Sequence, residues 1–229
     1  MESYNEIIGI IALTLGASWA SGINLYATIL ALGVASTTGS IELPENLQVL
    51  GNPLVIGAAG FMYFVEFFAD KVPGVDTGWD SIHTFIRIPA GALLASGMIA
   101  PTEAGLAAEV AVGLLGGGLA AATHATKAGS RVLINTSPEP VTNWTASILE
   151  DIAVFTGLWA ALNHPYWFVA SMILFILLLI WLLPKLWRGI KKVFNFLFNR
   201  DKKENEKEEQ KSESAKEFPP ILIEEKKTT

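Results

Sequence analysis

The sequence predicts an all-α membrane protein, a bundle of about six transmembrane helices. Of its 229 residues, 51% are hydrophobic and 17% are charged, whereas a typical soluble domain carries about 25% charged residues. Residues 1–184 contain four Lys or Arg against thirteen Asp or Glu, which are too few charges to coat a soluble core. This shortage of basic residues excludes a nucleic-acid-binding face. The absence of cysteine excludes disulfide scaffolds and Cys-ligated metal centres.

Six apolar segments meet or approach the length of about 20 residues that a membrane-crossing helix needs. They are Ile7–Ala35, Pro53–Ala69, His83–Ala100, Glu103–Thr126, Trp144–Leu162 and Trp167–Leu183. The last, WFVASMILFILLLIWLL, contains no charged residue, the second is short, and the third and fourth are rich in Ala and Gly. Together they predict a multi-pass protein whose partners include membrane lipids.

Basic residues near the ends of these segments predict the orientation. They flank the second and fourth loops and follow the sixth segment: Lys71, Arg87, Lys127 and Arg131, then seven between Lys185 and Lys203. Because Lys and Arg concentrate on the cytoplasmic side, six crossings place both termini in the cytoplasm of a bacterial inner membrane. The start, MESYNEIIGI, has none of the basic residues of a cleaved signal peptide.

The composition divides the chain into a transmembrane domain (1–184), a juxtamembrane helix (185–200) and a tail (201–229). In residues 185–200 apolar positions recur at helical spacing between Lys and Arg, which predicts an amphipathic helix on anionic lipid headgroups. The tail begins with DKKENEKEEQKSESAKE, and so low an apolar content predicts a disordered cytoplasmic segment.

Small residues recur every four positions in two of the predicted spans. The first span has Ala12, Gly16, Ala20, Asn24 and Thr28, and the fourth has Gly105, Glu109, Gly113, Gly117 and Ala121. Such faces let helix backbones approach closely in a membrane. A substrate path along the same seam is a second interpretation, compatible with the first.

Six spans also fit two inverted three-helix halves, a common plan among transporters. Two Asp–His pairs share a spacing of 13 residues, Asp70 with His83 and Asp151 with His164. Each long loop also contains a Pro-Glu pair, but these pairs require a different offset between the halves. The sequence therefore leaves the repeat open.

Ionisable residues inside a membrane are costly and commonly functional. Glu150 and Asp151 lie near the centre of the fifth span. Adjacent helical positions point about 100° apart, so the two carboxylates face different surroundings. They form either an ion-binding pair or two structural ion pairs with basic residues from elsewhere.

A second group of charges surrounds the Pro73-Gly74 break in VEFFADKVPGVDTGWDSIHTFIRIP. Glu66 and Asp70 share a face four residues apart, and a second stripe follows the break: Asp76, Asp80, His83 and Arg87. Carboxylate oxygens bind hard cations, and histidine can carry protons near neutral pH. The alternative is a capped helix start stabilised by local pairs.

A third group, His124, Lys127 and Arg131, lies on one face at the end of the fourth span. These side chains could hold a phosphate or carboxylate, or they could neutralise the carboxylates of the other two groups. Six carboxylates face four Lys or Arg near the spans. The surplus of two negative charges favours a cation or proton site, and the sequence does not say whether the cation is a metal.

Long, unusual strings identify a resemblance to a membrane family. SGINLYATILALG (21–33), VEFFADKVPGVDTGWDSIHTFIRIPAGALLA (65–95) and ATHATKAGSRVLINTSPEPVTNWTASILEDI (122–152) carry it. Over residues 10–180 the chain resembles the bacterial family catalogued as domain of unknown function 4126. The resemblance implies an integral membrane protein and no particular activity.

These features predict a small secondary transporter or exchanger for a cation, coupled to protons in one version. In that hypothesis Glu66, Asp70, Glu150 and Asp151 bind the ion. The vestibule is lined by Asp76, Asp80 and His83, and the counter-charges are Arg87, His124, Lys127 and Arg131. One alternative is a handler of an anionic or phosphorylated lipid, and another is a scaffold that docks a partner through the tail. A homo-oligomer is compatible with all three.

No Gly-rich phosphate loop, HExxH or GxSxG motif occurs in the sequence. These motifs place catalytic or phosphate-binding groups in a defined local structure. We therefore expect neither enzymatic activity nor a cofactor.

Overall fold

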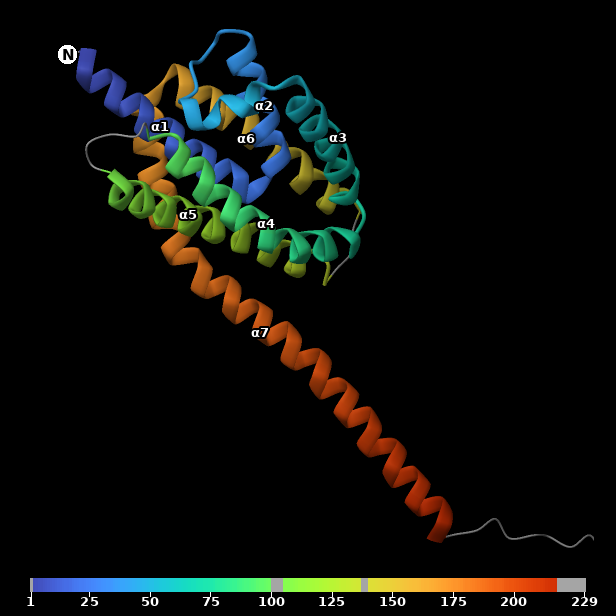
Figure 1. The fold of residues 1–229 in the computed structure, drawn as a ribbon. Helices are drawn as coiled ribbons and strands as arrows, with labels where there is room; N and C mark the ends of the chain where they lie inside the picture. The colour runs from blue at the N-terminus through green and yellow to red at the C-terminus, as the bar shows by residue number, and fades with distance from the viewer. Residues whose placement is uncertain (1, 100–104, 137–139, 218–229) are drawn as a thin grey trace, which may run out of the picture. The chain divides into compact units, whose positions relative to one another are not determined.

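The structure, a computed structural model, describes residues 2–99, 105–136 and 140–217, and every regular element in these ranges is helical (Figure 1). The elements are α1 (Glu2–Ile23), α2 (Leu25–Thr37), the 3-10 helix η1 (Glu45–Gly51), α3 (Pro53–Ala69), α4 (Val75–Gly97), α5 (Gly105–Ile134), α6 (Pro140–Asn163) and α7 (Pro165–Glu217). The chain divides into two units, Met1–Arg188 and Gly189–Thr229. The first contains α1 to α6 and the beginning of α7.

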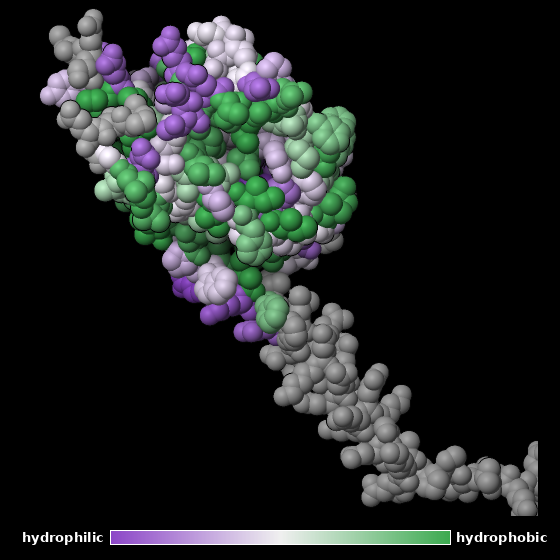
Figure 2. Space-filling view, viewed as in Figure 1, coloured by the Kyte–Doolittle hydropathy of each residue, from purple (hydrophilic) through white to green (hydrophobic). Residues whose placement is uncertain are grey.

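The first unit is apolar on its outside as well as in its core. Large hydrophobic side chains are exposed on α3, α5 and α7, among them Phe61, Leu114, Leu115, Leu174 and Ile180. Figure 2 shows hydrophobic residues over much of the visible face. Soluble monomers rarely expose contiguous apolar patches larger than a few hundred Å². This surface confirms the membrane character expected from the composition.

Four described helices are long and apolar enough to cross a membrane: Tyr4–Ile23, Gly105–Ile134, Val141–Asn163 and Pro165–Lys192. A fifth crossing results if η1 and α3, which meet at 65°, form one span. The all-helical fold is thus confirmed, whereas the expected count of six is not. The polar residues Asp80, His83 and Arg87 lower the hydropathy of α4, and the first predicted span is interrupted.

The interruption is at Asn24, where the predicted span Ile7–Ala35 splits into α1 and α2. Asn24 has an extended backbone (φ −147°, ψ 100°), and its side-chain oxygen accepts a hydrogen bond of 3.0 Å from the Ala27 amide. An asparagine in this conformation is a favourable N-cap, so it ends one helix and starts another. The 13 residues of α2 extend only about 20 Å, less than the hydrocarbon core of a bilayer.

The α1–α2 pair doubles back within the bundle. The Tyr166 hydroxyl donates to Asn5 Oδ1 at 2.6 Å, and Ser40, just past α2, lines the same pocket as Asn163. The start of α1 and the end of α2 therefore both lie near the α6–α7 junction, and Asn24 is at the tip where the chain turns back. The start of α1 thus lies at the opposite end of the bundle from the basic residues. The expected six crossings instead place the start of α1 at the same end as the basic residues.

The closest helix packing joins α4 to α5 through small residues. A Cβ atom added at Gly116 would lie 2.2 Å from the Ala95 Cβ, and one at Gly91 would lie 2.4 Å from the Ala120 Cβ. Gly113 and Gly117 of the predicted stripe face α4 as well, whereas Gly105 is exposed. The predicted stripe in α1 and α2 is buried along its length. No equivalent of the Asn24 break interrupts α5, so the inverted repeat gains no support.

We expect Gly116→Val to destabilise the protein, because the new side chain would overlap α4. Overpacking a tight core typically costs about 1–3 kcal/mol. Thermal unfolding of the purified protein in detergent measures the loss. Gly118→Val is the matched control, because a Cβ there meets no atom within 4 Å. Equal unfolding temperatures for the two variants would contradict the α4–α5 contact.

The second unit continues α7 to Glu217. Residues 201–217 are therefore helical, where the composition predicts disorder. Glu and Lys alternate in this segment, and both residues favour helix and form stabilising pairs three or four residues apart. Residues 218–229 of the predicted tail lie outside the described residues.

Candidate functional site

Ten charged residues, which we call the charge network, occupy one region of the first unit. They are the carboxylates Glu66, Asp70, Asp76, Asp80, Glu150 and Asp151 and the basic residues Lys71, Arg87, Lys127 and Arg131. They come from the ends of α3 and α5, the α3–α4 turn, the first half of α4 and the middle of α6. Nine of the ten are buried, and the tenth, the side chain of Glu150, is 20% exposed. A buried charge is tolerated only when it is paired and hydrogen-bonded, so the contacts within this charge network decide what it can do.

Arg87 joins α4 to α3 and α5. Its guanidinium donates to Glu66 Oε1 in a short ion pair, to Asp80 Oδ1 at 2.9 Å and to His124 Nδ1 at 3.0 Å. Asp80 and Arg87 lie two turns apart on one face of α4, which is the face that packs on α5. Arg87 is entirely buried, so its charge is neutralised by side chains alone.

Lys127 occupies the centre of the network. Its ammonium donates to Asp70 Oδ2 at 2.8 Å and lies 3.5 to 3.7 Å from the nearest carboxylate oxygens of Glu66, Asp80 and Glu150. It also donates to the main-chain carbonyl of Ile23 at 3.1 Å. This carbonyl belongs to the last residue of α1, so the break at Asn24 exposes a main-chain acceptor to the network.

Arg131 ties the α3–α4 turn to α6. It donates to Glu150 Oε2 at 2.7 Å, to the Asp70 carbonyl at 3.2 Å and to both the carbonyl and side-chain oxygens of Asn143. Asn143 in turn donates to the Asp70 carbonyl at 3.2 Å. Neither the backbone of Asp70 nor Asn143 was a predicted partner.

The residues predicted to line a vestibule have separate partners. Asp80 accepts from Arg87 at 2.9 Å. Asp76 lies in the first turn of α4, after the N-cap residue Gly74. It accepts from the Gly74 and Thr77 amides at 2.8 and 2.6 Å and from Asn135 at 2.9 Å. His83 stacks on Trp79 and contacts the Tyr26 hydroxyl at 3.1 Å, away from Asp76.

Asp151 differs from the other carboxylates. Its Oδ1 accepts from the Asn24 amide at 3.3 Å, and its buried Oδ2 has no hydrogen-bond partner among the described atoms. Each of Glu66, Asp70, Asp80 and Glu150 has a Lys or Arg nitrogen within 4.0 Å, whereas no described ion pair includes Asp151. Lys71, in the α3–α4 turn, donates to Ser147 and the Phe67 carbonyl.

Other acceptors in the network also lack described partners, namely Glu66 Oε2, Asp70 Oδ1 and Asp80 Oδ2. Among the described residues no group of three His, Asp or Glu is placed to hold a metal ion. The network therefore contains carboxylate oxygens that have no described hydrogen-bond partner, and these lie beside its buried ion pairs.

The basic residues proposed for an anionic ligand point inward. His124, Lys127 and Arg131 are all buried, and each contacts residues of the network or of its neighbouring helices. Lys127 and Arg131 pair with carboxylates, as the alternative of neutralising counter-charges predicts, whereas His124 accepts from Arg87 and contacts Thr84. Within the described part of the chain they do not form an accessible basic face.

The model of one protein family, described as Domain of unknown function (DUF4126), matches residues 11–185. This range agrees with the 10–180 expected from the resemblance. No curated protein and no solved structure matches the chain.

Proposed function

The chain belongs to the DUF4126 family, whose description names no activity, and we propose that it is a proton-coupled secondary transporter for a cation. The basic end of the bundle faces the cytoplasm, in line with the concentration of Lys and Arg at that end. The start of α1 and the α6–α7 junction then face the outside. No catalytic role is part of this proposal.

The observation that carries the proposal is the state of Asp151. A carboxylate buried at membrane depth is costly, and this one has a single amide donor and no described ion pair. A bound proton or cation supplies the missing partner at Oδ2. Four of the other five carboxylates already have basic partners, and Asp76 has amide donors. Binding at Asp151 therefore changes the charge of the network by one unit.

The break at Asn24 supports the same function. Interrupted helices at membrane depth are typical of transporters, where freed main-chain groups contact the cargo or coupling ion. Here one break presents the Asn24 side chain to Asp151 and the Ile23 carbonyl to Lys127. A shift of the α1–α2 tip would therefore change the contacts of both the carboxylate and the central ammonium.

The lipid-handling alternative has less support, because the three basic residues that would hold a headgroup are buried. Two of them, Lys127 and Arg131, are also paired with carboxylates. The scaffold alternative predicts that deleting residues 201–229 abolishes function. Transport through the first unit predicts that activity survives this deletion.

We expect Asp151→Asn to slow transport by about tenfold or more, since the loss of one transition-state interaction of about 1.4 kcal/mol has that effect. The protein is reconstituted into liposomes that contain a pH-sensitive dye. Gradients of Na⁺, K⁺ or tetramethylammonium are then imposed, and the resulting proton flux is recorded.

Glu109→Gln is the matched control, because it removes a carboxylate from α5 outside the charge network. Its flux should equal that of the unmodified protein. Proton flux in Asp151→Asn equal to that of the unmodified protein, or no gradient-dependent flux in either, would contradict the proposal. Size-exclusion profiles of all three proteins show whether the variants remain folded.

A further inference from the structure

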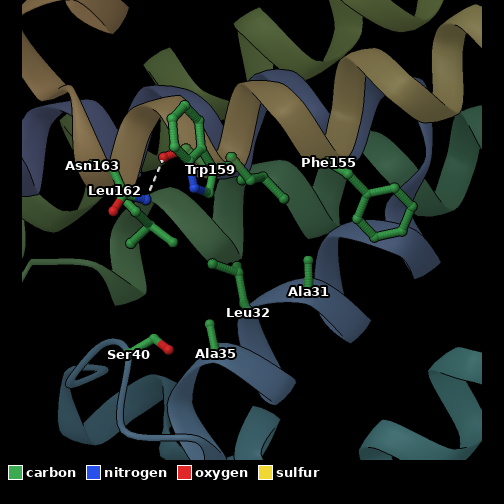
Figure 3. A pocket seen from close by; sticks show the side chains of 9 residues that line it. Ala31, Leu32, Ala35, Ser40, Phe155, Trp159, Leu162 and Asn163 are labelled. Carbon is green, nitrogen blue, oxygen red and sulfur yellow. Dashed lines mark hydrogen bonds between the residues drawn. The ribbon is translucent and has the colours of Figure 1, made fainter.

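A pocket of about 380 Å³ lies between the C-terminal halves of α2 and α6. It is lined by Ala31, Leu32, Ala35, Ser40, Phe155, Leu158, Trp159, Leu162 and Asn163. In Figure 3 the side chains of Ala31 and Ala35 point across the pocket toward those of α6. Its volume lies within the range of about 300–1,000 Å³ that small-molecule sites occupy.

The two helices that line the pocket lead from it to Asp151 and Asn24. Phe155, Leu158 and Leu162 follow Asp151 on one face of α6, and Phe155 is about 6 Å further along the axis. On α2, Ala31 and Ala35 follow Asn24 on one face. The pocket thus lies directly outward of the Asn24–Asp151 hydrogen bond.

Only a thin apolar layer separates the pocket from this hydrogen bond. Leu158 lines the pocket and also packs in one buried cluster with Val154 and Ala27. Val154 is one turn from Asp151, and Ala27 is the residue that Asn24 caps. A small movement of α2 against α6 would therefore join the pocket to Asp151.

The surroundings favour a cation of organic character. No charged residue lines the pocket. Asp151, to which both helices lead, is in no described ion pair, and its carboxylate attracts cations. Phe155 and Trp159 offer aromatic rings, which bind ammonium groups through cation–π contacts. A space of this volume also holds several more atoms than a bare metal ion.

We propose that this pocket is the outer vestibule of the transport path and that it takes a small organic ammonium ion, with Val154, Leu158 and Ala27 as the closed outer gate. This inference rests on the proposed function. Access to the pocket can nevertheless be measured without any transport.

The chain contains no cysteine, so Ala31→Cys introduces a single thiol into the pocket. Spheroplasts that express the full chain are treated with two membrane-impermeant methanethiosulfonates, one bearing trimethylammonium and one bearing sulfonate. Each rate is divided by the rate of that reagent with a free thiol in solution. We expect the cationic reagent to react about tenfold faster on this scale.

Tetramethylammonium chloride should slow the labelling of Ala31→Cys, and sodium chloride at the same concentration should not. Ala160→Cys is the matched control, because Ala160 lies on α6 at a similar level but lines a different groove. It should show neither the charge preference nor the protection. Ala35→Cys repeats the test within the pocket if Ala31→Cys is poorly expressed.

Equal normalised rates for the two reagents, equal protection by sodium, or no labelling of either pocket cysteine would overturn the vestibule. The transport proposal fails separately, if Asp151→Asn leaves the proton flux unchanged while the labelling behaves as described. In the combined Ala31→Cys, Asp151→Asn variant the preference for the cationic reagent should fall. A preference that stays unchanged there would show that Asp151 does not attract the cation.

Discussion

Arg87→Met is expected to leave little folded protein. Arg87 is the shared partner of Glu66, Asp80 and His124, and methionine fills a similar apolar volume without a charge. Two carboxylates would then be buried without their principal counter-charge. Removing one member of a buried ion pair typically costs about 3–5 kcal/mol, a large share of the stability of a domain of ordinary size.

Thermal unfolding and monodispersity in detergent measure this loss. Arg188→Met is the control, because that arginine is exposed and its side chain donates to the Pro184 carbonyl of its own helix. The double variant Arg87→Met, Glu66→Gln should recover part of the stability, since it removes one of the two unpaired charges. A stable Arg87→Met protein would contradict the role of Arg87 as the shared partner that stabilises Glu66 and Asp80 in the fold.

The membrane character and the helices themselves could be predicted from the sequence. Pro53–Ala69 was placed at the bounds that α3 has in the structure, because a proline start and a charged end delimit it. The split of Ile7–Ala35 could not be predicted from local pattern. Asn24 looks like one polar member of a small-residue stripe, and its partner Asp151 is 127 residues away in the chain.

The membership of the charge network was also accessible from the sequence, because so few ionisable residues lie near the spans. Burial in lipid forces opposite charges to meet. Which charges meet depends on helix packing, so the contacts of Arg87 with α3 and of Lys127 with four carboxylates could not be assigned. Asn143 and Asn135 were missed for another reason. They lie at helix ends, where a polar residue carries no signal of a buried contact.

The separation of Asp151 from the other carboxylates follows from the same packing. Glu150 and Asp151 are neighbours in sequence, yet Glu150 meets Arg131 on one side of α6 and Asp151 meets Asn24 on another. The surplus of two carboxylates counted in the sequence therefore has a definite location. Of the two carboxylates without a described ion pair, Asp76 is satisfied by main-chain amides and Asn135, whereas Asp151 has only the Asn24 amide.

Lys127→Met should destabilise the protein as strongly as Arg87→Met. The ammonium lies close to carboxylates from α3, α4 and α6 at once, and it donates to the Ile23 carbonyl at the end of α1. Its removal leaves mutual repulsion among those carboxylates, and a loss of about 3–5 kcal/mol is expected. Lowering the pH neutralises carboxylates, so the deficit relative to the unmodified protein should shrink in acid.

Lys71→Met separates this effect from the mere loss of a buried lysine. Lys71 lies in the same region and is equally buried, but it donates to Ser147 and the Phe67 carbonyl and contacts the Phe67 ring. No described ion pair includes it, so its replacement should cost less and should show a weaker recovery in acid. Equal losses for the two variants would mean that the central position of Lys127 among the carboxylates does not stabilise the fold.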